Sequence, residues 1–410
     1  MRRYYVNQHE KAGTAAAEGM TGLRILFCNY EYPPLGGGGG VVMAALARDL
    51  ARRHEVTVLT SRAKGLAALE SDRSVRVVRV PVFFRNQLAV ANFPSMLAYL
   101  PMAMARGMFL GKRGAFDVVN THFAVPTGPA GQALAAFYRV PNVLSIHGGD
   151  LYDPSKRLSP HRHAVLRFAV RRLLLAADAV VGQSRNTVGH VEGIYGVTRS
   201  VERIPLGIDR PPPLAAAPRE ELGLPRDAFV VVTVGRLVAR KSTVQLVKAL
   251  GASKCAAAHL LIVGDGPDAP NIRRAADDLG IGDRVHLLGQ VSDGEKYRAL
   301  ASADVFASAS QHEGFGLVFL EAMAYGLPVL CYDHGGQTDF LATGKTGHVL
   351  RLNDFGAFTR AIVDLHDNSQ RRLDMGRYNR AAVEEFFIDR CGERYEALFR
   401  ETIERRGASN

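Results

Sequence analysis

The sequence predicts an α/β protein built from two doubly wound parallel-sheet domains that face each other across a cleft. Three observations support this. Short apolar runs alternate with helical stretches, the series breaks once at a proline-rich segment, and the same alternation then restarts. The length of 410 residues fits two or three domains, since one domain takes roughly 150 residues.

The first series of strands lies in the N-terminal half. Its runs cover residues 24–29, 55–60, 75–80, 117–121, 142–146 and 179–181. Residues 36–40 are predicted to form a turn, and residues 41–53 show a helical pattern. Because helical stretches separate the strands, we expect a parallel sheet that is covered on both faces.

A proline-rich segment separates the two series. Residues 205–225 contain six prolines and no clear period, which is typical of a linker. Further strands are predicted at 229–234, 259–263, 285–288, 305–307 and 329–331, and a charged amphipathic helical stretch covers about 370–405. The predicted division is a disordered tail (1–22), a first domain (23–205), a hinge (206–228), a second domain (229–385) and a C-terminal helix (386–410) that could pack back on the first domain.

Composition excludes wholesale disorder, since 47% of the residues are hydrophobic and 22% are charged. The net charge of +11 suits phosphorylated ligands, anionic lipid or nucleic acid, and does not choose among them. None of the four cysteines falls in a C-x-x-C pair, so buried reduced thiols are expected instead of a zinc site or disulfides. The N-terminal residues lack a secretory apolar core. A cytoplasmic protein is therefore expected, with the inner face of the plasma membrane as a second option.

Residues 88–105 form a run of 18 residues without a charge, the lower limit for a membrane span. Pro94 and Pro101 argue against a span. A helix pair that faces an amphiphilic ligand or the membrane surface is one interpretation, because Arg106, Lys112 and Arg113 follow. Plain core packing is the other.

Five consecutive glycines, residues 36–40, follow the first strand and precede a helix. Such a backbone can approach an anion at a helix N-terminus, with Gly37 and Gly38 at its centre. No carboxylate ends the second strand, so this is not a dinucleotide fingerprint, and no P-loop is present. The alternative is a flexible loop without a ligand.

The turn GRLVARK carries three cations, Arg236, Arg240 and Lys241, just before a predicted helix. Cations at a helix N-terminus oppose the helix dipole, which lowers stability unless an anion lies among them. A diphosphate would satisfy both the dipole and the cations. The alternative is a solvated basic turn.

Two glutamates, Glu313 and Glu321, flank a glycine-containing apolar run. Glu321 is predicted within a helix in the apolar context LVFLEAMAYGLPVL, where a buried carboxylate needs hydrogen bonds. A vicinal diol such as ribose offers two donors to one carboxylate. Gly314 and Gly316 leave backbone N–H groups open at the helix start for sugar hydroxyls or phosphate. An exposed glutamate on a surface helix is the alternative.

His147 directly follows the predicted strand 142–146, in the sequence HGGD. The carboxyl end of a parallel strand is where such sheets bind ligands. A structural histidine is an equally good interpretation of this residue alone.

These residues together resemble the signature of the family-four retaining glycosyltransferases (group 1). Glu313 and Glu321 have the family's spacing of seven intervening residues. The other matching motifs, in chain order, are YPPLGGGG at 32–39, HGGD at 147–150, IPLGID at 204–209, GRL…K at 235–241 and VGDGP at 263–267. The resemblance covers nearly the whole chain after residue 22 and implies the GT-B fold, with two Rossmann-like domains.

The resemblance also implies that the first domain binds the acceptor and the second binds a nucleotide-diphosphate sugar, with UDP and GDP both open. Arg236 and Lys241 would bind the diphosphate, and Glu321 the ribose. Glu313 and the backbone of Phe315, Gly316 and Leu317 would contact the donor sugar, and His147 would contact the sugar near the reacting carbon. Gly37 and Gly38 would lie near the phosphates and the acceptor. Asp265 and Gly266 would flank the nucleoside.

The implied mechanism retains the anomeric configuration without an obligatory metal or cofactor. His147, Glu313, Arg236 and Lys241 would support it, and the leaving phosphate would accept the proton of the incoming hydroxyl. The sequence has no D-x-D motif at a strand end.

The chain departs from the family's pattern at two positions. Ser242 replaces the usual glycine and is expected to cap the next helix. Asp339 replaces a glutamate after Gly335-Gly336-Gln337-Thr338, which puts that contact in doubt.

The acceptor side is represented by two segments, residues 82–113 and the basic run 156–172, which has eight Lys, Arg or His residues. They suit a peripheral helix on anionic lipid and a sugar or lipid-linked acceptor, in cell-envelope polysaccharide or glycolipid synthesis. An ordinary solvated basic helix is the alternative.

Three other functions are alternatives to sugar transfer. A scaffold that binds nucleotide sugar without turnover would bind donor and transfer nothing. An epimerase would convert the donor with no acceptor present. A phosphorylase of the same fold would need a lysine that binds pyridoxal phosphate. Nucleic-acid binding is not expected, because no helix-turn-helix or RNA-binding signature accompanies the positive charge.

Overall fold

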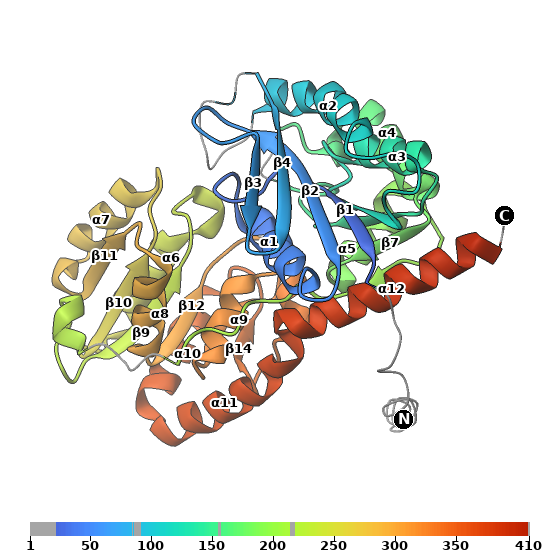
Figure 1. Cartoon of the computed structure of the whole chain (residues 1–410). Coiled ribbons are helices and arrows are strands. Elements are labelled where there is room, and N and C mark those ends of the chain that lie inside the picture. Colours follow the sequence, from blue (N-terminus) through green and yellow to red (C-terminus); the bar gives the residue numbers. More distant parts are fainter. Residues whose placement is uncertain (1–21, 84, 86–91, 155–156, 214–217, 409–410) are drawn as a thin grey trace, which may run out of the picture.

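The computed structural model describes residues 22–83, 85, 92–154, 157–213 and 218–408. The tail predicted at 1–22 lies outside these residues except for its last one. The described chain forms two α/β domains with a long C-terminal helix running beneath the first (Figure 1).

The first domain contains an eight-stranded sheet of order β3-β4-β2-β1-β5-β6-β7-β8. All neighbouring strands are parallel except β3 and β4. The strands are β1 (Arg24–Cys28), β2 (Glu55–Arg62), β3 (Leu69–Asp72), β4 (Val75–Pro81), β5 (Val118–His122), β6 (Asn142–Ile146), β7 (Ala179–Gly182) and β8 (Glu202–Arg203).

Helices cover both faces of this sheet. They are α1 (Gly38–Leu50), α2 (Phe93–Met108), α3 (Gly128–Tyr138), α4 (Ala164–Ala176) and α5 (Arg185–Tyr195). Successive residues of β1 enter different cores: Phe27 packs with the α1 side and Leu26 with the α2 and α3 side. This alternation explains why the strand is apolar throughout, since side chains along a strand point to opposite faces.

The second domain contains a six-stranded parallel sheet of order β11-β10-β9-β12-β13-β14. Its strands are β9 (Phe229–Val234), β10 (Ala258–Val263), β11 (Val285–Gly289), β12 (Val305–Ser308), β13 (Val329–Tyr332) and β14 (Gly347–Leu350). Its helices are α6 (Thr243–Ser253), α7 (Ala269–Asp278), α8 (Asp293–Ala301), α9 (Leu317–Ala324), α10 (Phe355–Asp367) and α11 (Ser369–Ala382).

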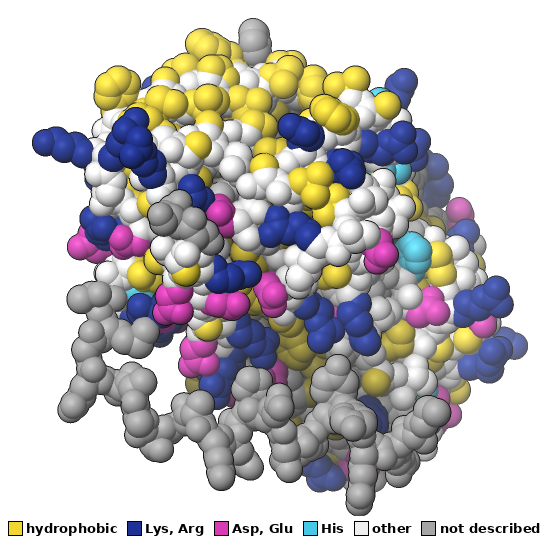
Figure 2. Space-filling model, turned by 90° about the vertical axis from the view of Figure 1, so that its right-hand side faces the viewer, with side chains coloured by type: hydrophobic (Ala, Val, Ile, Leu, Met, Phe, Trp, Pro, Cys, Tyr) yellow, Lys and Arg dark blue, Asp and Glu magenta, His cyan; other side chains and the backbone are white. Residues whose placement is uncertain are grey.

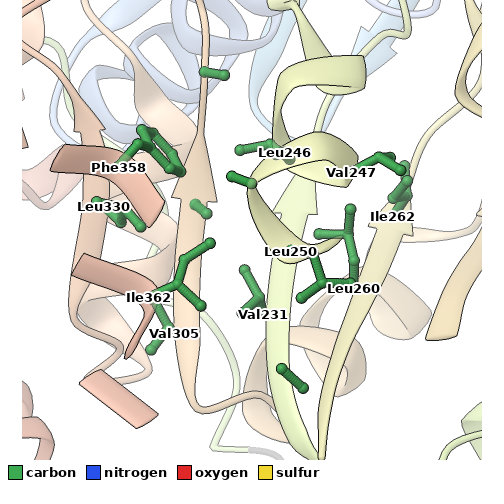
Figure 3. Close-up of a cluster of buried hydrophobic side chains, with 14 of the residues drawn as sticks. Val231, Leu246, Val247, Leu250, Leu260, Ile262, Val305, Leu330, Phe358 and Ile362 are labelled. Atoms are coloured by element: carbon green, nitrogen blue, oxygen red, sulfur yellow. The ribbon is translucent and has the colours of Figure 1, made fainter. Parts of the chain in front are cut away.

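The core of the second domain is also two-sided. Val231, Leu246 and Phe358 belong to the cluster between the sheet and helices α6 and α10 (Figure 3). Val230 and Val232 point to the opposite face, where α9 packs. Each fully buried aliphatic side chain of this kind contributes about 1.5–3 kcal/mol to folding.

Two chain segments, the predicted hinge and the C-terminal helix, join the two domains. Leu206, Ile208 and Leu224, within the predicted hinge, are buried in the core of the second domain. Helix α12 (Ile388–Ala408) then leaves the second domain and packs along α1 of the first, where Phe399 is fully buried.

The structure corrects several predicted elements. Helix α1 begins at Gly38, inside the predicted glycine turn, because the first turn of a helix needs no intrahelical partner for its N–H groups. The predicted stretch 370–405 is two helices, since the chain is extended at Phe387, whose neighbour Ile388 donates a backbone hydrogen bond to Ile208 (2.8 Å). Strands β3, β8 and β14 were not predicted.

Residues 93–108 form a single helix, not the predicted helix pair, while residues 88–91 lie outside the described residues. Pro94 lies in its first turn, where a missing N–H costs nothing. Pro101 lies in the interior of the helix and has no N–H group to donate to the Leu97 carbonyl. Leu97 is on the exposed face and open to water. Cys28, Cys331 and Cys391 are buried free thiols, as predicted.

Candidate active site

The site lies at the carboxyl ends of the strands of both sheets. In the second domain, the loop after β9 and the loop after β10 pack on each other. A Cβ added to Gly264 would lie 2.0 Å from the Gly235 carbonyl oxygen, and one added to Gly266 would lie 2.2 Å from that of Leu237. Asp265 accepts the Leu237 N–H through its carbonyl (2.9 Å). The structure therefore brings two of the predicted donor segments together.

Lys241 forms an ion pair with Glu313, and the Arg240 guanidinium is 3.8 Å from the same carboxylate. Burial alone would raise the pKa of Glu313, but the charges of Lys241 and Arg240 outweigh it and lower the pKa. Glu313 is therefore ionised at neutral pH. Arg240 is also held by the His312 carbonyl (2.6 Å).

Arg236, by contrast, is exposed and makes no ion pair with any described residue. It follows Gly235, which has a φ of 151°, at the end of β9. Its guanidinium is thus available to an anion at the mouth of the site.

Glu313 opens the loop that leads into helix α9. Gly316 is the N-cap of this helix with a φ of 93°, and no side chain caps the helix. A Cβ at Gly316 would lie 2.4 Å from the Phe319 ring. Phe315 is buried and packs against Phe340, with ring centroids 5.2 Å apart. Phe319 donates its N–H to the Gly316 carbonyl (3.0 Å), so the N–H groups of Leu317 and Val318 are the ones open to a ligand at this helix start.

Glu321 lies further along α9, and its carboxylate pairs with Lys296 of α8 (2.8 Å). Burial raises the pKa of Glu321, and the Lys296 charge limits the rise. The exposed-helix alternative is wrong, because only 14% of the Glu321 side chain is accessible. Sequence reasoning missed Lys296, although a cation is the expected partner of a buried carboxylate.

His147 lies at the end of β6 in a chain of polar side chains. Asn120 donates through Nδ2 to the Val143 carbonyl (2.9 Å) and the Ser145 hydroxyl (3.0 Å), so its Oδ1 accepts the Nε2–H of His122 (2.8 Å). The Nδ1 of a neutral His122 is then an acceptor, and His147 donates its Nε2–H to it (2.9 Å). His147 Nδ1 is thus left as a hydrogen-bond acceptor.

This Nδ1 atom is buried and has no hydrogen-bond partner among the described residues. Burial lowers the pKa of His147 to about 4, so the ring is neutral at pH 7. The ring also stacks on Phe123, with centroids 4.3 Å apart. A neutral histidine with one open acceptor is suited to binding a hydroxyl group and not to donating a proton.

The backbone around His147 is fixed by two further side chains. Asp150 accepts the N–H of His147 (2.9 Å) and of Ala124 (2.7 Å). Gln183, at the end of β7, donates to the His147 carbonyl (2.7 Å). Sequence reasoning missed His122, Asn120 and Gln183, and the available signal was that polar residues end the apolar strands β5 and β7.

The glycine loop meets the second domain at the start of α1. A Cβ at Gly38 would be 3.7 Å from Leu317, at the start of α9. A Cβ at Gly39 would lie 2.5 Å from the Phe123 ring that stacks on His147. Gly37 has open space around its Cα. The N-termini of α1 and α9 therefore converge beside His147. Among the described residues, no cluster of three or more His, Cys, Asp or Glu side chains is placed to hold a metal ion.

Two family models match the chain. The model described as "Glycosyltransferase Family 4" matches residues 36–210, and the model described as "Glycosyl transferases group 1" matches residues 216–382. Between them they span both domains. The molecule is thus a glycosyltransferase with the GT-B fold.

Among the curated relatives is the GDP-mannose-dependent α-(1-6)-phosphatidylinositol monomannoside mannosyltransferase of Mycolicibacterium smegmatis. It is 32% identical over 371 residues, which cover 86% of this chain and 91% of the relative. The N-acetyl-α-D-glucosaminyl L-malate synthase of Bacillus anthracis is 25% identical, with 91% and 96% of the two chains covered.

Solved structures show the same fold. Sucrose-phosphate synthase from Thermosynechococcus elongatus superimposes with a TM-score of 0.77 at 22% identity, covering 92% of this chain and 98% of that one. Anabaena HepE in complex with UDP and glucose gives 0.73 at 20% identity, covering 92% and 100%. This chain belongs to the family-four, group 1 glycosyltransferases.

Proposed function

We propose that this enzyme transfers a sugar, with retention of configuration, from a nucleotide-diphosphate sugar to a hydroxyl of a membrane glycolipid acceptor. The observation that supports this most strongly is the convergence of two uncapped helix N-termini, α1 at Gly38 and α9 at Leu317, beside the Lys241–Glu313 ion pair. Such a place favours an anion and provides backbone donors around it.

The donor diphosphate would bind Arg236 and Lys241. Lys241 has three donor hydrogens, so it can hold Glu313 and a phosphate oxygen together. Arg236 is exposed, so its guanidinium can bind a phosphate without first breaking an ion pair with a described residue. Glu321 would accept the ribose hydroxyls through the oxygen that Lys296 leaves open. Asp265 and Gly266 would flank the nucleoside.

The sugar would lie between His147 and the loop from Glu313 to Leu317. His147 Nδ1 would accept a hydrogen bond from a sugar hydroxyl, while Glu313 and the backbone of Phe315, Gly316 and Leu317 hold the other hydroxyls. The leaving phosphate, held by cations and helix N-termini, would take the proton of the acceptor hydroxyl on the same face of the sugar.

Retention by this route is supported by the state of the nearby carboxylates. Glu313 is tied to Lys241 and Arg240, and Asp150 is tied to backbone N–H groups, so neither is poised as a nucleophile. The cations would also replace a metal ion in neutralising the diphosphate. The product formed should therefore be the retained anomer by NMR, at a rate that EDTA does not change.

The donor experiment is thermal unfolding against UDP, GDP, ADP and their sugar conjugates. GDP-mannose is the first sugar donor to test, because relatives at 32–33% identity are named as GDP-mannose-dependent. A ligand at ~100 times its dissociation constant adds ~2.7 kcal/mol of stability. We expect one nucleotide to stabilise the protein, with the shift lost in Arg236→Ala and Glu321→Ala. No shift with any nucleotide would contradict the donor site, and binding without transfer would favour the scaffold function.

The acceptor side of the first domain carries an exposed apolar surface, here called the α2–α4 surface. Its large members are Phe93, Leu97, Phe109, Val165 and Phe168, which are 43–81% exposed. Figure 2 shows hydrophobic side chains gathered over this part of the molecule, with Lys and Arg around them. Residues 82–113 and 156–176 contain no Asp or Glu. We propose that this surface binds anionic lipid and presents the cleft to a lipid-linked acceptor.

Among the described residues, no helix combines the length and apolarity that a membrane span needs. Vesicle flotation tests the surface contact. We expect wild type to bind vesicles containing phosphatidylglycerol and not pure phosphatidylcholine. Phe109→Ser combined with Phe168→Ser should weaken binding by about tenfold or more, because two exposed aromatic side chains that would enter the lipid are lost. Leu373→Ser is the control, because Leu373 on α11 is an apolar residue about as exposed as Phe168. Equal binding by all variants would contradict the proposal.

A further inference from the structure

Asp339 is a second-domain residue whose carboxylate binds the first domain. It ends the turn η5 (Gly336–Asp339), which packs against the start of α5 in the first domain. Its side chain is 10% exposed. The position is the one at which the sequence departs from the family's glutamate, so its contacts decide whether the acidic side chain keeps a role.

Three donors of the first domain reach this carboxylate. The backbone N–H of Arg185 donates to Oδ2 (2.8 Å) and the Arg185 Nε donates to Oδ1 (3.1 Å). A guanidinium nitrogen of Arg203 lies 3.5 Å from Oδ2. Arg185 is the first residue of α5, so its N–H has no partner within the helix. Ser184 caps a different group, the N–H of Thr187 (3.1 Å). Asp339 thus completes the cap of a helix in the other domain.

The residues on either side of this cap lead to the two halves of the active site. On the first-domain side, Gln183 donates to the His147 carbonyl (2.7 Å). On the second-domain side, Gly336 donates its N–H to the Glu313 carbonyl (2.9 Å). A Cβ at Gly336 would lie 3.0 Å from the Ser184 hydroxyl, so the two segments are in close contact.

The loops themselves also meet. A Cβ at Gly314 would lie 3.4 Å from both the Gln183 amide nitrogen and the His147 carbonyl oxygen. The segments 183–185 and 335–339 therefore form one short connection between the histidine of the first domain and the donor loop of the second.

We propose that Asp339 is a positioning residue for sugar transfer, which holds the donor loop at its working distance from His147 by capping α5 across the domain interface. This inference rests on the proposed transfer reaction. Asp339 touches neither donor nor acceptor in this account, and it acts through Gln183 and Gly336. A charged carboxylate at a helix N-terminus, with two arginines beside it, is well suited to such a contact.

The position of Asp339 predicts a specific kinetic pattern. Donor binds within the second domain, so Asp339→Ala should leave the dissociation constant of the nucleotide within about twofold. The turnover number should fall roughly 5- to 150-fold, the range of a typical coupling between sites. Asp339→Glu, which keeps the charge, should retain most of the turnover. Asp374→Asn, which removes an exposed carboxylate of the same domain on α11, is the matched control.

The experiment combines kinetics with small-angle scattering of the full-length protein. We expect Asp339→Ala and Asp339→Asn to show a larger radius of gyration and a lower turnover number than wild type and Asp374→Asn, at equal nucleotide affinity by calorimetry. Equal scattering and equal turnover would overturn the proposal, as would a loss of nucleotide affinity that accounts for the whole effect. Scattering does not depend on turnover. An inactive wild type would therefore count against the proposed transfer, while the radius of gyration would still test whether Asp339 holds the two domains together.

Discussion

The open acceptor on His147 is set by its neighbours. Asn120 fixes the orientation of His122, and His122 fixes the tautomer of His147, so a side chain two steps away decides which atom meets a ligand. Burial keeps the ring neutral, which removes it from acid catalysis near neutral pH. The role that we propose for it is the recognition of a sugar hydroxyl.

Replacing His147 by Phe tests this role. The variant keeps an aromatic ring that can stack on Phe123, although a larger one, and it removes both nitrogen atoms. Because a missing partner for a buried hydroxyl costs about 1–3 kcal/mol, we expect kcat/KM to fall by about 5- to 150-fold. A donor analogue that lacks the contacted hydroxyl should be equally poor with both enzymes. If the variant lost as much rate with every deoxy analogue as with the full donor, the hydroxyl contact would be wrong.

At the same scale, the residues that sequence reasoning found and those it missed differ in kind. Glu313, Glu321 and His147 follow motifs, so their spacing was enough to select them. Lys296 and His122 lie on other elements. Lys296 reaches Glu321 only when α8 packs beside α9, and His122 reaches His147 only when β5 packs beside β6. Their contacts depend on tertiary structure, which one sequence without its fold does not display.

Among the elements, the start of α6 shows why one local prediction was wrong. Ser242 was expected to cap the helix through its side chain. In the structure it has a φ of 48°, and its hydroxyl bonds back to the Ala239 carbonyl (3.2 Å), so no side-chain cap is formed. A left-handed conformation costs a non-glycine residue about 1–2 kcal/mol, which agrees with the glycine that the family resemblance implies at this position.

Ser242→Gly is therefore expected to stabilise the protein by about 0.5–1 kcal/mol, since the relief of strain exceeds the added flexibility of the unfolded chain. Urea unfolding measures the change. Ser292 provides the matched control, because it caps α8 with a φ of −68° and a true hydrogen bond to the Glu295 N–H (3.3 Å). The same substitution there should cost a few tenths of a kcal/mol. Changes of the same sign at both sites would show that φ is not the cause.

For the molecule as a whole, all the correctly predicted strands except β11 have a neighbour on each side, and central strands such as β1 and β9 are apolar on both faces. The missed strands are β3, β8 and β14, which all lie at sheet edges, and β3 and β8 also carry charged residues. An edge strand is defined by its single neighbour, so composition gives little signal for it. The two facing domains were predicted from the alternation of strands and helices and from the proline-rich segment, and the family resemblance implied the same arrangement.

The stability of the whole molecule should decline as pH falls below about 6.5. Burial lowers the pKa of His147 to about 4 in the folded protein, while an unfolded histidine has a pKa of about 6.5. Between these values the unfolded chain binds the proton and the folded chain does not, so acid favours unfolding. The contribution of the neutral His147 ring to the free energy of unfolding is complete above pH 6.5 and is lost as pH falls to 4. A single group of this kind contributes a slope of up to about 1.4 kcal/mol per pH unit.

Urea unfolding between pH 7.5 and 4.5 measures this slope, and two variants assign it. His147→Phe should reduce the slope by up to about 1.4 kcal/mol per pH unit, because it removes the titrating ring. The pKa of His190 is also lowered to about 4, by burial and then by His312, His161 and His334, so His190→Gln should reduce the slope as well. Its effect should be smaller, since His190 is only partly buried and water screens its charge. Slopes equal to wild type in both variants would mean that other groups carry the acid sensitivity.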